Sequence, residues 1–411
     1  MGWKERILLL LLASINFTHI LDFMVMMPLG NFLMPYFKIS AQQFSFVVAS
    51  YSIAAAVSGF SAAFFVDRFD RKKVLLFGYI GFIIGTICCG LAPTYSLLLT
   101  ARIVTGLFGG LIGAQVMSIV ADSFAYEKRG YAMGILFSAF SLASIIGVPF
   151  ALFLADTISW HAPFILIGIL GAFIIPAVMK FLPSMEGHVH GANGMREKPW
   201  QVLKTLFGNS QQLLALALSG SLMLGHFLII PFLNPYMEMN VGFTSGQRNL
   251  VYMVGGVASF VASPLIGKLA DKYGKHKVFY IFACLSLIPI FLITNMPAIK
   301  YYYVLMVTGV WFALSSGRSI PAQAIITNVV RPEQRGSFMS FNGSIQQLFT
   351  GMASLIAGMI VLVGAGGKIQ HYAWVGYLSI AIVFGCVFIA KMIHTTKEPI
   401  PSLQQSVDGV A

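Results

Sequence analysis

Twelve long apolar runs recur along the chain, and they restrict its possible folds more than any other feature. A run of about 20 apolar residues is long enough to cross the ~30 Å hydrocarbon core of a bilayer as an α-helix. Short polar, Pro or Gly joins such as Ala92-Pro93-Thr94 separate the runs. The sequence therefore predicts an all-α membrane protein with transmembrane helices at 7–34, 44–66, 74–92, 96–121, 132–155, 163–182, 210–234, 247–267, 278–296, 301–329, 338–363 and 372–393.

Composition supports a lipid-facing surface. The chain is 57% hydrophobic and only 10% charged, whereas soluble domains carry about 25% charged residues. Its net charge of +12 does not indicate a nucleic-acid partner, because the basic residues lie in small groups between apolar runs and form no stripe.

The placement of Lys and Arg predicts the orientation in the membrane. If the N-terminus is cytoplasmic, 20 of the 26 basic residues fall in cytoplasmic segments and 4 in outer loops. This bias follows the positive-inside rule, so we expect a multi-pass protein of the plasma (inner) membrane with both termini in the cytoplasm. The four outer residues are Lys38, Arg248, Lys300 and Lys368.

An internal repeat divides the chain into halves. Val-Asp-Arg-Phe-Asp-Arg-Lys-Lys-Val at 66–74 returns as Ala-Asp-Lys-Tyr-Gly-Lys-His-Lys-Val at 270–278. We expect one six-helix bundle at 1–182, a polar cytoplasmic linker at 183–209, and a second bundle with a short tail at 210–411. Parallel six-helix halves are one of the layouts of secondary transporters, with the substrate site near the bilayer midplane.

Other classes of function lack their motifs. The chain has neither a G-x-x-x-x-G-K-[ST] loop nor an H-E-x-x-H pair, which argues against an ATP-driven pump and a zinc protease. All four cysteines fall in predicted spans without metal spacing. We therefore expect no enzyme activity, no cofactor and no metal.

The second copy of the repeat, Gly-Lys-Leu-Ala-Asp-Lys-Tyr-Gly-Lys-His-Lys at 267–277, resembles the loop signature of the major facilitator superfamily. The first copy departs from that signature, since Ala63 and Asp70 occupy its two glycine positions. The resemblance implies two pseudo-symmetric six-helix bundles and alternating access. It also implies a cytoplasmic gate, although the basic members could act only as topology anchors; these residues are Asp67, Arg68, Arg71, Asp271, Lys272, Gly274 and Lys275.

Charged residues inside a span are rare because each costs roughly 2.5–3.5 kcal/mol on insertion scales, so they usually mark a pathway or a proton relay. Asp22 is the only acidic residue predicted deep within a span, and Arg102 and Arg318 are the only deep basic residues. The helical rise of about 1.5 Å per residue places Asp22 and Arg102 at a similar depth. We expect these two residues to interact and to couple transport to protons.

Polar residues on the same spans are candidates for a substrate cavity. His19 precedes Asp22 by three residues and shares its helix face, and the repeat offset of 204 (271 − 67) relates Asp22 to His226. Interhelical hydrogen bonding is the alternative for each amide. The candidate cavity residues are His19, His226, Arg318, Gln115, Gln323, Asn342 and Gln346.

Two segments resemble signatures of one branch of the superfamily. Arg102 with Gly106 is similar to the R-x-x-x-G signature of proton-linked members. Gly147 and Pro149 resemble the fifth-helix signature of proton-coupled antiporters, although Val148 separates a glycine and a proline that are adjacent in that signature. The resemblance implies a drug:proton antiporter-like exporter of a small organic solute.

Two alternatives stay open at this point. Two deep arginines against one deep aspartate favour a transporter of an anionic or polar nutrient, such as an organic anion, a sugar or a phosphorylated solute, bound by Arg318. A more distant alternative is a membrane sensor that does not transport. We expect a monomer whose partners are the bilayer, a small-molecule substrate and protons.

Overall fold

A computed structural model describes residues 2–65, 69–124, 126–185, 208–330, 335–364 and 366–394. Before the linker it contains α1 (Trp3–Met26), α2 (Gly30–Phe37), α3 (Ala41–Phe65), α4 (Arg71–Gly90), α5 (Tyr95–Ser123), α6 (Tyr126–Leu142), the π-helix η2 (Ala143–Gly147), α7 (Val148–Thr157) and α8 (Ala162–Phe181). After the linker it contains α11 (Ser210–Phe227), α12 (Ile230–Tyr236), the π-helix η3 (Met237–Val241), α13 (Ser245–Tyr273), α14 (Lys275–Thr294), α15 (Tyr301–Thr327), α16 (Arg335–Ile360), β1 (Leu362–Val363), β2 (Ile369–Gln370) and α17 (Tyr372–Met392).

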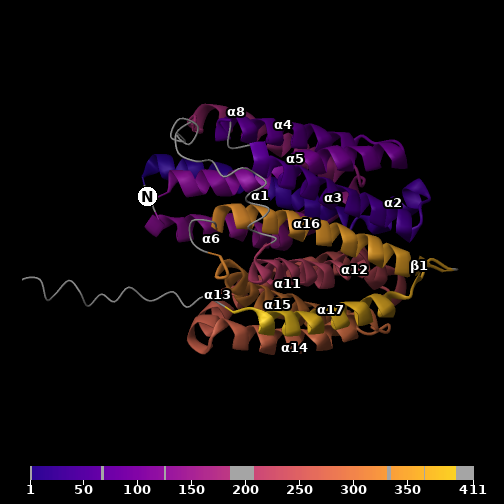
Figure 1. Cartoon of the computed structure of the whole chain (residues 1–411). Helices are drawn as coiled ribbons and strands as arrows, with labels where there is room; N and C mark the ends of the chain where they lie inside the picture. Colours follow the sequence, from indigo (N-terminus) through magenta and orange to yellow (C-terminus); the bar gives the residue numbers. More distant parts are fainter. Residues whose placement is uncertain are drawn as a thin grey trace, which may run out of the picture.

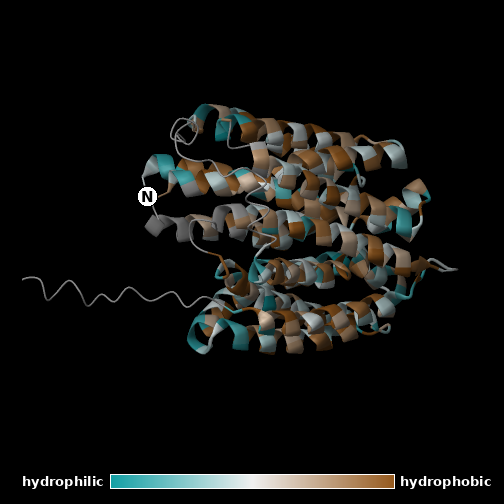
Figure 2. Ribbon diagram, in the orientation of Figure 1, coloured by the Kyte–Doolittle hydropathy of each residue, from teal (hydrophilic) through white to brown (hydrophobic). Residues whose placement is uncertain are grey.

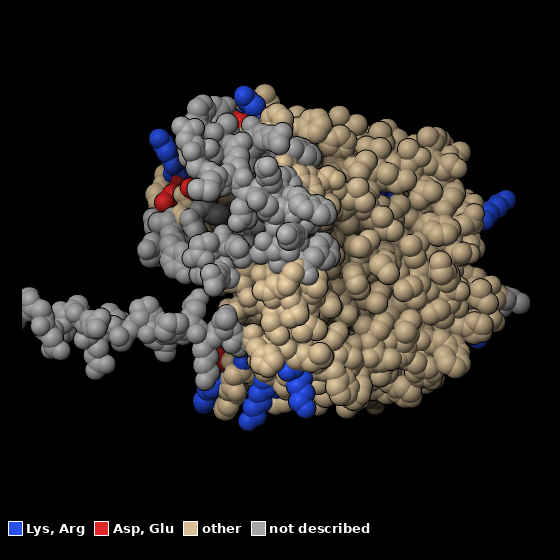
Figure 3. All heavy atoms as spheres, viewed as in Figure 1, with Lys and Arg blue, Asp and Glu red and all other residues tan. Residues whose placement is uncertain are grey.

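The long helices run roughly side by side, so the bundle has two ends (Figure 1). We call the end that holds the N-terminus proximal and the end that holds α2, α12 and β1 distal. Hydrophobic residues dominate the middle of the bundle (Figure 2). Lys and Arg gather near the proximal end, and the middle of the visible surface shows almost no charge (Figure 3). This distribution is that of a membrane protein with a lipid-facing belt.

The predicted all-α membrane fold is confirmed. Ten helical segments of the described chain are long and apolar enough to cross a bilayer. The predicted spans at 301–329 and 338–363 also form helices, α15 and α16, although neither reaches that apolarity. α16 packs against α3 and α11, and α15 against α11, α13 and α14. Because protein covers much of their surface, their polar residues need not face lipid.

The first predicted span, 7–34, is not one helix. α1 ends at Met26, and a turn at 27–29 leads into α2. Pro28 lies in this turn and has no backbone N–H to donate to a continued helix. The break places α2 at the distal end, where it contacts α12.

The fifth predicted span, 132–155, begins earlier and is interrupted. α6 starts at Tyr126, and η2 replaces the α-helical pattern before α7. Pro149 follows within the first two residues of α7, where its missing N–H is tolerated. π-Helical turns widen a helix locally and are frequent at functional sites.

Glycines permit close helix contacts within the first half. A Cβ at Gly106 would stand 2.3 Å from the Tyr51 carbonyl oxygen, and one at Gly110 would stand 2.3 Å from the Ala55 carbonyl oxygen. Only glycine therefore lets α5 approach the backbone of α3 so closely, as small residues do in membrane bundles.

The most extensive contacts between the helices before the linker and those after it are α3 with α16, α7 and η2 with α13, and α2 with α12. Smaller contacts join α6 to α13 and α5 to α16. The α3–α16 contact extends from Ser45 beside Gly358 near the distal end to Phe60 beside Phe341 near the proximal end. We call the boundary between the helices before the linker and those after it the seam.

The proximal loops explain why the two repeat copies differ. Asp70 caps α4 by accepting a hydrogen bond from the Lys72 backbone N–H at 2.9 Å. The second copy has Gly274 at the matching place, with a φ of 93°, a left-handed conformation that favours glycine.

A short β1–β2 hairpin near the distal end is the one pair of strands in the described chain, and the all-α prediction did not include it.

Candidate functional site

The centre of the first half contains an ion pair that lies entirely inside the protein. Arg102 Nη1 on α5 donates to Asp22 Oδ2 on α1 at 2.7 Å, and the two side chains are 1% and 0% exposed. Thr86 Oγ1 on α4 donates to the other carboxylate oxygen at 3.1 Å. The interaction expected between Asp22 and Arg102 is therefore present, and Thr86 is a partner that the sequence did not indicate.

Tyr51 on α3 covers the guanidinium of this pair. The Arg102 Cζ lies 4.4 Å from the centroid of the Tyr51 ring, within cation–π range. The pair is thus held by α1, α3, α4 and α5 together. A buried ion pair of this kind gains little net stability, because desolvation offsets the Coulomb attraction, but removing one partner leaves a costly unpaired charge.

His19 lies beside the pair, one helical turn nearer the proximal end. Its ring centroid is 6.3 Å from that of Tyr51 and 5.4 Å from that of Phe82. Its Nε2 is buried and has no hydrogen-bond partner in the described protein. His19 and the Asp22–Arg102 pair are therefore both neighbours of Tyr51.

The second half has a buried arginine without a carboxylate. Arg318 on α15 is 1% exposed, and its Nη1 donates to Ser286 Oγ on α14 at 2.9 Å. Its Nη2 has no partner in the described protein, and the nearby titratable groups are Cys386 on α17 and His226 on α11. The guanidinium is therefore directed into the second group of helices rather than across the seam.

The remaining predicted cavity residues do not form one cluster. His226 stacks on Trp311 at 5.0 Å between ring centroids, and it makes no hydrogen bond or ring contact with His19. Gln346 Nε2 on α16 donates to Ser219 Oγ on α11 at 2.9 Å, which is the interhelical bond expected as the alternative reading. Gln115 and Asn342 are buried, each with an unpartnered side-chain oxygen, and Gln323 is half-buried.

Aromatic rings meet where the two groups of helices face each other. Phe23 on α1 lies 5.6 Å from Phe227 on α11, and Phe44 on α3 lies 6.1 Å from Phe232 on α12. Phe23 also contacts Tyr51 at 5.8 Å. The seam beside the buried ion pair is therefore lined by apolar and aromatic side chains.

A second charged network joins the halves at the distal end. Arg248 Nη2 on α13 donates to Asp156 Oδ1 on α7 at 2.6 Å. Arg248 Nη1 also pairs with Glu238 in η3, which in turn accepts from Asn31 on α2. Phe32 lies 5.0 Å from the guanidinium. The network connects α2 and α7 to η3 and α13 across the seam.

Arg248, counted among the outer basic residues, lies in the first turn of α13 and is 2% exposed, so this outer residue is buried by protein. Glu238 lies in the π-helix η3. The sequence near Arg248 gives no sign that it pairs with Asp156, because the two residues are 92 positions apart.

The predicted proximal gate is only partly described. Asp67 and Arg68 lie outside the described residues. Arg71 pairs with Asp122 on α5 at 2.5 Å, a contact within one half. Asp271 is exposed and has no hydrogen-bond or ion-pair partner among the described residues, Lys272 Nζ lies 5.2 Å from the Tyr273 ring, and Lys275 begins α14.

Gly147 and Pro149 lie where α1, η2 and α7 meet. A Cβ at Gly147 would stand 2.7 Å from Leu21 Cδ1, so the glycine lets η2 approach α1 one residue before Asp22. η2 also packs against α13, where a Cβ at Gly256 would stand 2.9 Å from Ser144 Cβ. The antiporter-like segment therefore contacts both the ion-pair helix and the opposite half.

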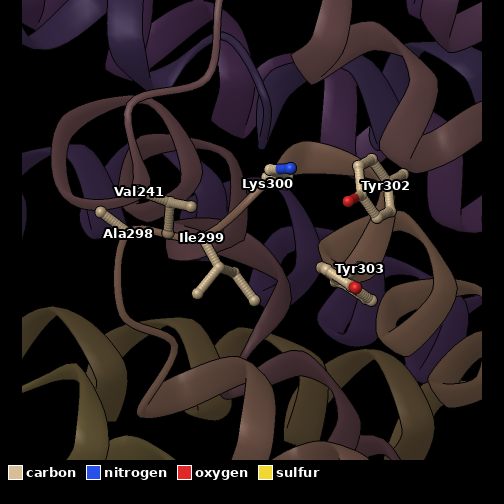
Figure 4. Close-up of a pocket in the computed structure, with 6 residues that line it drawn as sticks. All are labelled: Val241, Ala298, Ile299, Lys300, Tyr302 and Tyr303. Atoms are coloured by element: carbon tan, nitrogen blue, oxygen red, sulfur yellow. The ribbon is translucent and has the colours of Figure 1, made fainter.

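A hollow of about 640 Å³ opens near the distal end (Figure 4). It contains none of the predicted site residues, and it lies among helices that follow the linker. The hollow is therefore separate from the buried ion pair; its lining residues are Val241, Ala298, Ile299, Lys300, Tyr302 and Tyr303.

A multi-pass bundle with a charge pair at its centre and a seam between two groups of helices defines a membrane transporter. The model of the Major Facilitator Superfamily matches residues 12–233 and 215–409. The chain belongs to this superfamily, whose members are transporters and not enzymes.

Curated relatives are distant along most of the chain. It is 22% identical to the uncharacterized MFS-type transporter YceJ of Bacillus subtilis (strain 168) over 393 residues, which cover 94% of this chain and 96% of that protein. It is 34% identical to multidrug resistance protein 3 of the same organism over 150 residues, which cover 36% of this chain and 29% of that protein.

Solved structures share the fold at low identity. The chain resembles a D-xylose-proton symporter with a TM-score of 0.76 and 17% identity, over 96% of this chain and 99% of that one. It also resembles a bacterial homologue of the human lysosomal transporter Spinster, with a TM-score of 0.73 and 14% identity, over 96% and 97% of the two chains. The chain therefore transports a small molecule through the major facilitator fold.

Proposed function

We propose that this transporter is a proton-coupled exporter of a small apolar organic solute, of the drug:proton antiporter type. The observation that carries the proposal is the fully buried Asp22–Arg102 pair. A carboxylate inside a bilayer-spanning bundle changes the local charge when it binds a proton, and such groups form proton relays in transporters.

The surroundings of the pair favour an organic, largely apolar substrate. The adjacent seam is lined by Phe23, Phe227 and Tyr51, and apolar sites with a few polar groups suit organic molecules. The similarity to a multidrug resistance protein is consistent with this substrate class. In this proposal the substrate binds along the seam and the proton binds at Asp22.

We further propose the arrangement that alternating access requires. Residues 1–182 and 210–411 move as two bundles joined by the linker 183–209, and both termini and the linker are on the cytoplasmic side of the plasma membrane. The basic proximal end supports this orientation. The Arg248 network closes the distal, outer side in the structure, and Asp67 and Asp271 help to close the proximal side in the opposite state. A monomer suffices for this cycle.

The decisive experiment replaces Asp22 with Asn, which keeps the size of the side chain but removes its titration. In proteoliposomes, Asp22→Asn should still exchange labelled substrate for unlabelled substrate at equal pH on both sides. A pH gradient should no longer drive uptake or release, because the protonation step is absent.

Glu5→Gln is the matched control, since Glu5 lies on the same helix but in its first turn, at the membrane edge. This variant should keep wild-type coupling. If Asp22→Asn keeps it as well, while a thermal melt shows that the variant is folded, Asp22 is not the coupling residue and the proton-coupled proposal fails.

A second candidate function is the transport of an anionic or polar nutrient. The observation that favours it is the buried Arg318, whose Nη2 lacks a partner in the described protein. A carboxylate or phosphate would satisfy that guanidinium as a bidentate ligand. Competition of an organic anion against a labelled organic cation in the same proteoliposomes distinguishes the two candidates.

A further inference from the structure

Two buried polar atoms from different helices converge on one glycine beside the ion pair. At Gly109 on α5, an added Cβ would stand 2.7 Å from Tyr51 Oη and 3.1 Å from His19 Nε2. Neither atom has a hydrogen-bond partner in the described protein, and Tyr51 is fully buried. Buried polar groups almost always have a partner, either protein or ordered water.

We propose that Tyr51 Oη and His19 Nε2 bind a shared water molecule in front of Gly109, and that this site relays the proton between the proximal side and Asp22. The inference rests on the proposed function and adds to it the route of the proton. A bridging water satisfies both atoms at once, and a site with two or more polar groups can hold one. Only glycine at position 109 lets the Tyr51 hydroxyl and the His19 imidazole both approach α5 this closely.

The position of His19 suits a relay. α1 runs from the proximal end towards the distal end, so a proton that leaves Asp22 for the proximal, cytoplasmic side meets His19 three residues, about 5 Å, along the helix axis. This is the direction that proton-driven export requires. The protonated Asp22 carboxyl gives its proton to His19, and the imidazolium passes a proton to the water, which releases it towards the proximal side. The imidazole and the water return to their neutral forms, one positive charge has moved, and the ionised carboxylate regains its attraction to Arg102.

Tyr51 links the water site to the ion pair. Its hydroxyl faces Gly109 while its ring covers the Arg102 guanidinium at 4.4 Å. A change in the charge of the Asp22–Arg102 pair therefore acts directly on Tyr51, which binds the water. Phe23, which packs on Tyr51 and on Phe227, extends this contact to the seam.

The titratable groups around His19 are few. They are Asp22 on α1, Tyr51 on α3, Tyr79 (bonded to Thr18) and Cys89 on α4, and Arg102 on α5. The described side chains of α6 and η2 contribute no titratable group, whereas α7 and α8 carry only Asp156 and Lys180, near opposite ends of the bundle. A pH response that depends on His19 therefore involves this small set.

Glycine substitutions on α5 test the water site. Gly109→Ala places a methyl group against Tyr51 Oη and His19 Nε2 and displaces the ends of these two side chains, which disrupts the water site between them. Gly113→Ala is the control, one turn further along the same helix, because a Cβ there meets nothing within 4 Å. Tyr51→Phe is a second test that removes the hydroxyl but keeps the ring over Arg102.

The measurement is the rate of proton uptake after a pH jump in proteoliposomes, read from a pH-sensitive dye, together with substrate exchange at equal pH. Gly109→Ala and Tyr51→Phe should each slow proton uptake by about tenfold, the equivalent of one hydrogen bond, and Gly109→Ala should leave exchange unchanged. Gly113→Ala should match the wild type. In an experimental density map, a water should lie within hydrogen-bond distance of both atoms in the wild type only.

Two results overturn the inference. If Gly109→Ala and Tyr51→Phe take up protons at the wild-type rate while Asp22→Asn is uncoupled, the relay is wrong and the proposed function stands. If Asp22→Asn remains coupled, the proposed function fails and the relay fails with it. Should Gly109→Ala not fold, the rate of Tyr51→Phe alone decides.

Discussion

Arg102 and Arg318 show how differently two arginines can be accommodated in one bundle. Both are about 1% exposed, but Arg102 faces a carboxylate and an aromatic ring, whereas Arg318 has a serine hydroxyl. The difference follows from the residues on the neighbouring helices, since α14 and α17 supply Ser286 and Cys386 and no acid. An arginine without a counter-ion is costly inside a membrane unless water or a ligand meets it.

Replacing Arg318 separates the two candidate substrates. For an exporter of apolar or cationic solutes, Arg318→Gln should change substrate affinity by less than about twofold, because the guanidinium is directed away from the seam. Binding of a labelled organic cation measures this. For an anion transporter, the same variant should weaken anion binding by tenfold or more, and Arg318→Lys should restore only part of it because an ammonium lacks the bidentate fork. That second pattern would exclude the exporter reading.

At the scale of helices, local interactions at helix ends position the site. Asp70 accepts hydrogen bonds from Lys72 N–H, Ser184 Oγ and Met185 N–H, so it joins the start of α4 to the segment after α8. Partial burial acts to raise the pKa of Asp70, but these hydrogen bonds and the nearby Lys73 outweigh it and hold the pKa below its usual value. The ionised carboxylate is therefore the form that the folded protein prefers.

Asp70→Ala should destabilise the protein by about 1 kcal/mol through the lost helix cap. Because the folded-state pKa is depressed, the charge of Asp70 contributes stability above the unfolded pKa and loses it as the pH falls through the folded-state pKa. The difference in melting temperature between wild type and Asp70→Ala should therefore shrink below about pH 4. Asp70→Asn, which keeps a capping oxygen but no charge, should lose less stability than Asp70→Ala at neutral pH; a melting temperature of Asp70→Asn equal to that of the wild type would contradict the charge effect.

The distal network also holds helices together, since Arg248 joins α13 to α7 and η3. Arg248→Ala leaves Asp156 and Glu238 without their cation, and because these two carboxylates are 18% and 36% exposed, the cost is below the ~3–5 kcal/mol of breaking a fully buried pair. In Arg248→Ala, the state that is closed at the distal side should become less populated. A cysteine placed on the seam should then react faster with a membrane-impermeant thiol reagent added from the distal side.

Lys300→Gln serves as the control for the distal network, because Lys300 is an exposed cation at the same end. It should leave labelling unchanged. Equal labelling rates in Arg248→Ala and the wild type would show that the α2–α12 and α3–α16 contacts suffice to keep the distal side closed.

At the scale of the whole molecule, a transporter must exchange two arrangements of its halves that differ by only a few kcal/mol. In this structure the seam is continuous along α3 and α16 and is reinforced by charge at the distal end. The proximal end has no such reinforcement among the described residues, and Asp271 is exposed there. The structure thus has its stronger crossing contacts on the distal side.

Asp271→Asn should shift the resting population towards the state that is open at the proximal side, because Asp271 stabilises the opposite state in the proposed cycle. A cysteine on the proximal part of the seam should then be labelled faster from the cytoplasmic side, whereas Glu5→Gln at the same end should have no effect. Unchanged labelling in Asp271→Asn would place the proximal gate at other residues.

The sequence by itself determined the properties that add up over neighbouring residues, such as mean hydropathy. Mean hydropathy over about 20 residues was sufficient to predict membrane helices, because insertion free energy adds along a segment. The isolated Asp22 and Arg102 stood out for the same reason, since each is a charge within an apolar run. The repeat at 66–74 and 270–278 predicted the duplicated plan that the family model then confirmed.

Only the tertiary structure decided which polar groups meet. Arg248 stands at the start of the predicted span 247–267 with no local sign that it pairs with Asp156, 92 positions away, and with Glu238. Thr86 and Tyr51 carry no local sign of their contact with the Asp22–Arg102 pair. Helical periodicity says which face a residue occupies but not which helix packs there, and burial, pairing and the shared approach to Gly109 depend on that packing.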